Sequence, residues 1–97
     1  MLSNIKPIDS INKTSFIISP NPFSKSTQIS FTIGYNSHVK IKIMDVYGMT
    51  IKQLMDGEVQ KGNYSLVWNA NNNCAGIYLC VFETEQEKFT RRIVLTK

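Results

Sequence analysis

Alternation of apolar and polar residues along most of the chain predicts β-strands. Residues 29–33 and 39–44 alternate strictly, so each segment has one face suited to a core and one suited to water. Shorter runs of the same kind occur at residues 16–19, 50–55 and 64–68. No apolar stripe with the helical period persists for three turns, as an amphipathic helix would require. The pattern predicts an all-β protein.

The most hydrophobic stretch, residues 75–82, is expected to lie at the centre of the sheet. After Gly76 the chain runs through consecutive apolar or aromatic residues, between an asparagine-rich segment and an acidic one. A run of this kind without alternation predicts a strand that is buried on both faces. An acidic hairpin loop follows, and residues 89–97 are the expected final strand.

Turn chemistry separates the predicted strands. The segment Pro20-Asn21-Pro22-Phe23 contains two prolines, which lack a backbone donor, so it cannot belong to a central strand. We expect it to form a rigid corner, with Phe23 turned inward against the core. Asp45 and Gly48 stand at the first and last positions of a type I turn. This spacing predicts that the chain reverses between them.

The connections also suggest how the strands are ordered. Residues 34–37 are expected to turn the chain between two neighbouring antiparallel strands, 29–33 and 39–44. Asp56-Gly57 and Lys61-Gly62 are two closely spaced turn signals. We expect the chain to cross there from one sheet to the other.

Seven short strands, spaced roughly ten residues apart, predict an immunoglobulin-like antiparallel β-sandwich. The chain lacks the Cys…Trp…Cys spacing of an antibody-type domain. Residues 1–14 show no repeating pattern of apolar residues, and we interpret them as a linker or flexible arm. The folded domain is therefore expected to cover residues 15–97.

Composition limits the possible functions. The chain has 97 residues, enough for one domain that buries about 60–65% of its unfolded surface. A net charge of +4 supports solubility but does not indicate nucleic acid as a partner, since Lys40 and Lys42 alternate with apolar residues as on a solvated strand face. The sequence contains no apolar run long enough to predict a membrane span. The N-terminal residues do not resemble a secretory signal, so we expect any export signal to lie upstream on a longer parent.

The sequence offers no arrangement of residues suited to catalysis, which needs a nucleophile beside a base, paired acids or a metal. His38 is the only histidine. Cys74 and Cys80 would lie roughly 20 Å apart in an extended chain, too far for a disulfide. Asp45 and Asp56 are interpreted as turn-capping residues, and His38 as an isolated surface histidine. We therefore predict no catalytic residue, no metal site, no cofactor and no enzymatic activity.

Five motifs in sequence order resemble the C-terminal sorting domain of cargo proteins of the Bacteroidetes type IX secretion system (type A, Por secretion system family). The resemblance covers residues 17–97. Three departures are Ser19, Met49 and Val81, which stand where the family commonly has an aromatic, a basic and a charged residue. The motifs are Ser19-Pro20-Asn21-Pro22-Phe23, the alternating strand that ends in Asp45-Val46-Tyr47-Gly48, Gly62-Asn63-Tyr64 with Leu66 and Trp68, Ala75-Gly76-Ile77-Tyr78, and Arg91-Arg92-Ile93-Val94-Leu95-Thr96-Lys97.

The resemblance implies that the domain is an address label on a larger cargo protein. It implies transit through the periplasm, recognition by a shuttle receptor of the outer-membrane secretion machinery, and removal by a sortase-like peptidase that cuts upstream of Phe16. The cargo would then reach the cell surface or the extracellular space. The residues expected to carry recognition are Pro20, Asn21, Pro22, Phe23, Asp45, Gly48, Gly62, Trp68, Gly76, Tyr78, Arg91, Arg92, Ile93, Val94, Leu95 and Lys97.

The last strand admits two interpretations. Its main chain could pair with the edge of a receptor sheet, with Arg91, Arg92 and Lys97 adding charge contacts. Alternatively, Ile93-Val94-Leu95 completes the core. The resemblance also implies that Tyr78, Cys80 and Phe82 face the core and that Ile77, Leu79 and Val81 form a second, partly covered face.

Two other functional classes stay open at the level of sequence. One is an adhesive or carbohydrate-binding module centred on Tyr35 or Tyr47, the aromatic residues expected at turns. The other is a structural spacer, like the immunoglobulin-like part of flagellar hook-capping proteins, which has similar Pro-Asn-Pro and Gly-Ile-Tyr motifs.

Overall fold

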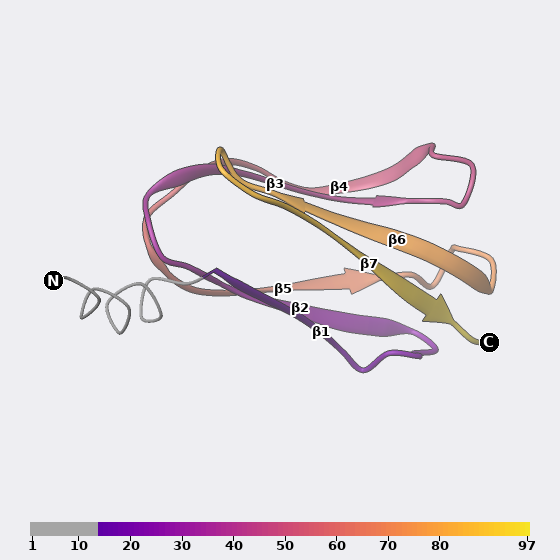
Figure 1. The fold of residues 1–97 in the computed structure, drawn as a ribbon. Helices are drawn as coiled ribbons and strands as arrows, with labels where there is room; N and C mark the ends of the chain where they lie inside the picture. The colour runs from indigo at the N-terminus through magenta and orange to yellow at the C-terminus, as the bar shows by residue number, and fades with distance from the viewer. Residues whose placement is uncertain (1–13) are drawn as a thin grey trace, which may run out of the picture.

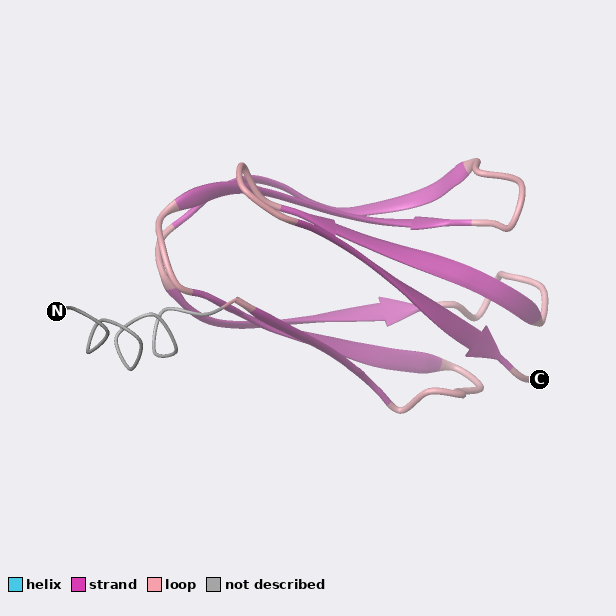
Figure 2. Ribbon diagram, viewed as in Figure 1, coloured by secondary structure: helices cyan, strands magenta, loops and turns pink. Residues whose placement is uncertain are grey.

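Seven strands form two packed antiparallel sheets in the computed structural model, which describes residues 14–97 (Figure 1). One sheet has the order β1-β2-β5 and the other β4-β3-β6-β7. The described chain consists of strands and the loops between them (Figure 2). This confirms the predicted immunoglobulin-like β-sandwich. The strands are β1 (Ser15–Ser19), β2 (Ser26–Ile33), β3 (Ser37–Met44), β4 (Thr50–Val59), β5 (Gly62–Asn69), β6 (Gly76–Glu83) and β7 (Lys88–Leu95).

Residues 14–97 contain no helix with the length and apolar character that a membrane crossing would need. The predicted arm, residues 1–14, lies outside the described residues except for Thr14.

Aromatic rings from both sheets meet in the core at Phe82 of β6. The ring of Phe82 stacks on that of Phe16 at 4.8 Å between centroids and contacts the rings of Phe31 at 5.2 Å and Phe89 at 6.0 Å. Phe16 and Phe31 belong to the opposite sheet, so these contacts join the two layers. Aromatic pairs in such offset or tilted geometry add about 0.5–1.5 kcal/mol each beyond the burial of their area.

A second aromatic group surrounds Trp68 of β5, which is fully buried. Its ring lies 5.4 Å from that of Phe23 and 5.3 Å from that of Tyr78, measured between centroids. Phe23 is buried as well, which confirms that the corner residue turns inward.

The predicted pairing of residues 29–33 with 39–44 is wrong. β2 pairs with β1 and β5, whereas β3 pairs with β4 and β6, so the two strands lie in different sheets. The segment between them crosses from one layer to the other. The Tyr35 hydroxyl fixes this crossing through hydrogen bonds with Thr84 Oγ1, at 2.8 Å, and Glu87 Oε1, at 3.0 Å.

The predicted turn at Asp56-Gly57 is also wrong, because both residues lie within β4 and pair with β3. Two irregularities in the β3–β4 register accompany this long strand. The chain does cross between the sheets as expected, but only after Val59. There the backbone N–H of Lys61 donates to Asn36 Oδ1 at 2.9 Å.

β6 is buried on both faces only in its second half. Tyr78, Cys80 and Phe82 face the core, which confirms the orientation that the family pattern implied. On the other face Val81 is buried but Ile77 is exposed. The prediction of a strand buried throughout is therefore correct for only part of residues 75–82.

The sandwich has two ends, which we name by what they carry (Figure 1). The arm end holds the start of β1 and the connections β2–β3, β4–β5 and β6–β7. The motif end holds the corner after β1, the turn between β3 and β4, the loop between β5 and β6 and the end of β7. Strands of about eight residues, rising about 3.3 Å each, separate the two ends by roughly 25 Å.

We predict that Phe82→Ala lowers the free energy of unfolding by about 3–5 kcal/mol, because it leaves a cavity between the two sheets. Urea unfolding followed by tryptophan fluorescence measures this loss. Ile17→Ala is the matched control, since Ile17 points to solvent and its truncation should cost less than about 0.5 kcal/mol. Equal losses for the two variants would contradict the central role of Phe82.

Candidate functional site

The fold gathers most of the predicted recognition residues at the motif end. The corner residues 20–23, the turn residues Asp45 and Gly48, the end of β5, the start of β6 and the end of β7 all lie there (Figure 1). Gly62 does not, because it starts β5 at the arm end. Residues far apart in the sequence therefore form one surface.

The corner, residues 20–23, lies along the outer edge of β7. Asn21 makes two contacts with the backbone of that strand: its Nδ2 donates to Arg92 O at 2.9 Å, and its Oδ1 accepts from Val94 N at 3.0 Å. The side-chain amide thus pairs with β7 as the peptide group of a neighbouring strand would. Both X-Pro peptide bonds of the corner are cis.

Phe23 continues this pairing with its own backbone. Its N–H donates to Val94 O at 3.0 Å, and its carbonyl accepts from Thr96 N at 2.7 Å, beside an isolated parallel bridge to Leu95. The corner therefore covers the edge of β7 from Arg92 to Thr96. The first half of β7 is the part of this edge that the corner leaves open.

The turn between β3 and β4 is fixed by the Asp45 carboxylate, as the sequence predicted. Asp45 Oδ1 accepts the N–H groups of Tyr47, at 2.9 Å, and Met49, at 3.0 Å. Gly48 has a φ of 90°, which favours glycine. Val46, Tyr47 and Met49 are left exposed.

The loop between β5 and β6 rests on Tyr78. Its hydroxyl donates to the Cys74 carbonyl, while partial burial raises the pKa of the phenol. Gly76 begins β6 with a φ of 151°, which side-chain-bearing residues rarely adopt. Gly76 and Tyr78 therefore shape the loop that follows the buried Trp68.

The residues of β7 divide into core and surface positions. Ile93 and Leu95 are buried, so this strand does complete the core, as one interpretation required. The Arg91 guanidinium lies over the rings of Phe16 and Phe89, at 5.7 and 5.6 Å, and supports the packing. Arg92 is exposed, and Lys97 Nζ donates to Asn71 O at 2.7 Å.

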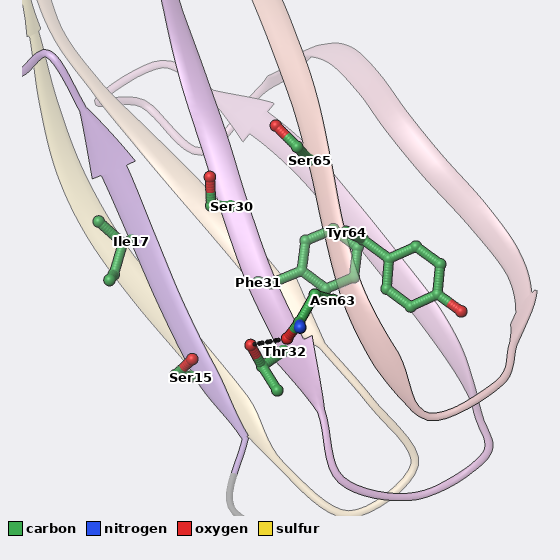
Figure 3. Close-up of a pocket in the computed structure, with 8 residues that line it drawn as sticks. All are labelled: Ser15, Ile17, Ser30, Phe31, Thr32, Asn63, Tyr64 and Ser65. Carbon is green, nitrogen blue, oxygen red and sulfur yellow. Dashed lines mark hydrogen bonds between the residues drawn. The ribbon is translucent and has the colours of Figure 1, made fainter.

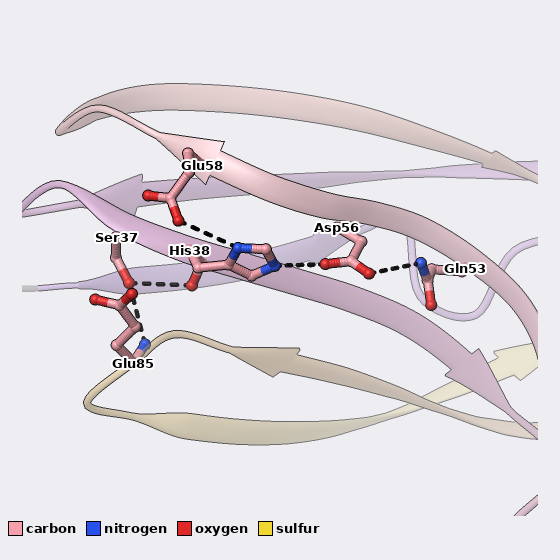
Figure 4. Close-up of polar contacts among 6 residues, drawn as sticks. All are labelled: Ser37, His38, Gln53, Asp56, Glu58 and Glu85. Carbon is pink, nitrogen blue, oxygen red and sulfur yellow. Dashed lines mark hydrogen bonds and ion pairs between the residues drawn. The ribbon is translucent and has the colours of Figure 1, made fainter.

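Sequence reasoning missed a polar cluster on β3 and β4 (Figure 4). His38 Nε2 contacts Asp56 Oδ1, and His38 Nδ1 contacts Glu58 Oε2 at 3.3 Å. The hydrogen bond to Asp56 raises the pKa of His38, and the same contact lowers the pKa of Asp56. The assumed turn at Asp56-Gly57 hid this cluster, because it removed Asp56 and Glu58 from the strand that pairs with His38.

A shallow hollow of about 390 Å³ lies on the outer face of the three-stranded sheet (Figure 3). Hydroxyl groups of β1, β2 and β5 line it, and Thr32 Oγ1 donates to Asn63 Oδ1 at 2.7 Å. The lining carries no carboxylate, amine or imidazole; it consists of Ser15, Ile17, Ser30, Phe31, Thr32, Asn63, Tyr64 and Ser65.

The remaining reactive groups are placed for structure. Burial raises the pKa of the Cys80 thiol to about 12, so it is held protonated, and Cys74 is a free cysteine at the surface. Within residues 14–97, no three His, Cys, Asp or Glu side chains gather into a possible metal site. The motif end offers hydrogen-bonded backbone, exposed apolar groups and cations, an arrangement that can bind a partner.

Comparisons with known proteins agree with this picture. A family model described as "Secretion system C-terminal sorting domain" matches residues 17–96. The structure resembles that of dimeric latent PorU from Porphyromonas gingivalis, with a TM-score of 0.57 and 16% sequence identity over 86% of this chain. The matched part is 9% of the PorU chain, and at this identity the likeness concerns the fold alone. Among curated proteins, none matches the chain.

We predict that Asn21→Ala loosens the end of β7. Without the Asn21 amide, the Val94 N–H loses its acceptor, and the free energy of unfolding falls by about 1–2 kcal/mol. Amide hydrogen exchange should quicken at Val94 more than at Thr96, which keeps its bond to Phe23 O. Gln28→Ala on the outer face of β2 is the control and should leave both amides unchanged. Equal protection of Val94 in Asn21→Ala would contradict the pairing.

The His38 cluster predicts a pH dependence of stability. Because the folded pKa of His38 is raised, its contribution is complete below its ordinary pKa of about 6.5 and is lost as pH rises through the folded value. Asp56 has a lowered folded pKa, so its contribution is present above its ordinary value and is lost as pH falls through the folded one.

Urea unfolding at about pH 5.5 and about pH 8.5 measures this dependence. Wild type should exceed His38→Gln in stability by more at the lower pH. In an Asp56→Asn background the same substitution should give a smaller difference between the two pH values. If His38→Gln changed stability equally at both pH values in the wild-type background, this would contradict a raised pKa of His38 in the folded protein.

Proposed function

Because the chain belongs to the family of type IX secretion system C-terminal sorting domains, we propose that it directs an attached cargo protein across the outer membrane through that system. The cargo passes through the periplasm and is delivered to the cell surface or the extracellular space. A sortase-like peptidase then removes the domain. In this proposal the domain is the substrate of the export machinery and performs no reaction of its own.

The observation that carries the proposal is the gathering of most of the family motifs at the motif end. The Pro20-Asn21-Pro22 segment and the last strand are separated by about 70 residues of sequence, yet Asn21 pairs with Arg92 and Val94. A receptor can therefore contact the first and last motifs together. This supports recognition of the folded surface rather than of a linear peptide.

The position of the arm end supports a model in which cargo joins one end of the domain and a receptor binds the other. β1 starts at the arm end, so a cargo that precedes it would join the domain on the side away from the motif end (Figure 1). Cleavage within the arm, residues 1–14, would leave every strand pairing of the sandwich intact, because Ser15 is the first paired residue. Apart from Thr14, the arm lies outside the described part of the chain.

The motif end also suggests which side chains a receptor would contact. Arg92 and Lys97 are exposed cations beside the covered edge of β7. Arg91 is instead engaged over two aromatic rings, and Ile93 and Leu95 are buried. We therefore assign charge contacts to Arg92 and Lys97, and a supporting role to Arg91, Ile93 and Leu95.

We predict that residues 1–97, fused behind a reporter with its own export signal, carry the reporter out of a bacterium that has a type IX secretion system. The double variant Arg92→Ala/Lys97→Ala should leave most of the reporter in the periplasm, because the receptor loses its charge contacts. Cell fractionation and immunoblotting measure the distribution.

The matched control is Lys61→Ala/Lys88→Ala, which removes two exposed cations from the arm end. It should be exported like the parent fusion. Circular dichroism of each purified domain shows whether its strands are formed. A folded parent fusion that never leaves the cell would refute the proposal, and export unaffected by Arg92→Ala/Lys97→Ala would refute the assigned contacts.

A further inference from the structure

Exposed apolar side chains concentrate in the turn between β3 and β4. Of the seven large apolar residues that are exposed in residues 14–97, four fall within residues 46–51. Val46 is 57% exposed, Tyr47 87% and Met49 67%. We call residues 45–51 the apolar tip.

The sandwich does not need these side chains. Asp45 and Gly48 fix the turn through the Asp45 carboxylate and the positive φ of Gly48, and polar residues at positions 46, 47 and 49 would leave that geometry unchanged. Three apolar groups in contact with water lower solubility without stabilising the fold. Their placement on a fixed turn indicates contact with something outside the domain.

Cations share the motif end with the apolar tip. Arg92 lies in the same row of the sheet as Met44, since Leu79 pairs with both, and Lys52 follows the tip directly. Lys97 and Lys25 flank the neighbouring loop of the motif end, where they contact Asn71 and Ala70.

Acidic residues lie elsewhere. Among residues 14–97, Asp45 is the only acid of the motif end, and its carboxylate is already bonded to backbone N–H groups. The others belong to the half of the sandwich nearer the arm end; they are Asp56, Glu58, Glu83, Glu85 and Glu87. The motif end is thus basic and apolar, whereas the opposite half holds five acids together with cations such as Lys61 and Lys88.

We propose that the apolar tip docks on an anionic lipid surface. Tyr47 and Met49 would enter the boundary between headgroups and acyl chains, while Lys52, Arg92 and Lys97 meet the lipid phosphates. A protruding turn with apolar residues at its tip and cations behind it matches a flat surface that is apolar inside and negatively charged outside.

This docking goes beyond the proposed sorting function and does not depend on it. It gives the domain an orientation, with the motif end against the membrane and the arm end away from it. Cargo joined at the arm end would face the aqueous side.

Flotation of the purified domain with vesicles tests the proposal. Vesicles of phosphatidylcholine mixed with phosphatidylglycerol should bind the wild type, and vesicles of phosphatidylcholine alone should bind it weakly. Tyr47→Ser/Met49→Ser should weaken binding to the anionic vesicles by about tenfold or more, because two apolar anchors are lost. Added salt should also weaken binding of the wild type.

Ile17→Ser/Val67→Ser is the matched control. These residues are 62% and 61% exposed, close to the 67% of Met49, but they lie on the outer face of the other sheet. The control should bind like the wild type. Equal binding of the two double variants to the anionic vesicles would overturn the proposal. Failure of the wild type to bind these vesicles would overturn it as well.

The reporter assay distinguishes this proposal from the sorting function. Normal export of the reporter together with absent vesicle binding would overturn lipid docking alone and would assign the apolar tip to a protein contact. Vesicle binding that needs Tyr47 and Met49, without any export of the reporter, would leave lipid docking standing and refute sorting.

Discussion

The pairing between Asn21 and the edge of β7 is the constraint on which the motif end depends. An edge strand presents unpaired N–H and C=O groups, which invite association with other chains. Here a short corner of the same chain satisfies them, with the amide of Asn21 and the backbone of Phe23 taking the place of a neighbouring strand. Because Phe23 also packs on Trp68, the corner, β7 and the core are held as one unit.

This arrangement limits how a partner can engage β7. Adding a foreign strand along its second half would first require the corner to leave, at a cost of about 1 kcal/mol for each hydrogen bond and a further 2–3 kcal/mol for exposing Phe23. Strand addition on the first half, before Arg92, carries no such cost. Contact with the intact surface also avoids it. The energetics therefore favour a receptor that leaves the corner in place.

The sequence predicted which residues are buried better than which strands are neighbours. Alternation placed Ile29 and Ile41 on core-facing positions, and the Asp45 turn followed from local chemistry. The inward orientation of Tyr78 followed only from the family resemblance. Alternation does not say which strand hydrogen-bonds to which, so β2 and β3 were paired wrongly. Asp-Gly sequences favour turns, but pairing of Asp56 and Gly57 with Lys40 and Val39 places them in an extended strand. Contacts such as Asn21 with Arg92 join segments 71 residues apart, which no local pattern reveals.

The two ends of the sandwich differ in what their polar contacts do, and the strands hold the two ends apart. At the arm end, polar contacts such as those of Tyr35 with Thr84 and Glu87 fix the crossings between the sheets. At the motif end, the corner and the Asp45 turn use internal hydrogen bonds to hold backbone in place while leaving apolar and cationic side chains free. A surface that is rigid before binding loses little conformational entropy when it binds. Because hydrogen bonds already fix the backbone of the motif end, the entropic cost of binding there comes mainly from ordering its exposed side chains.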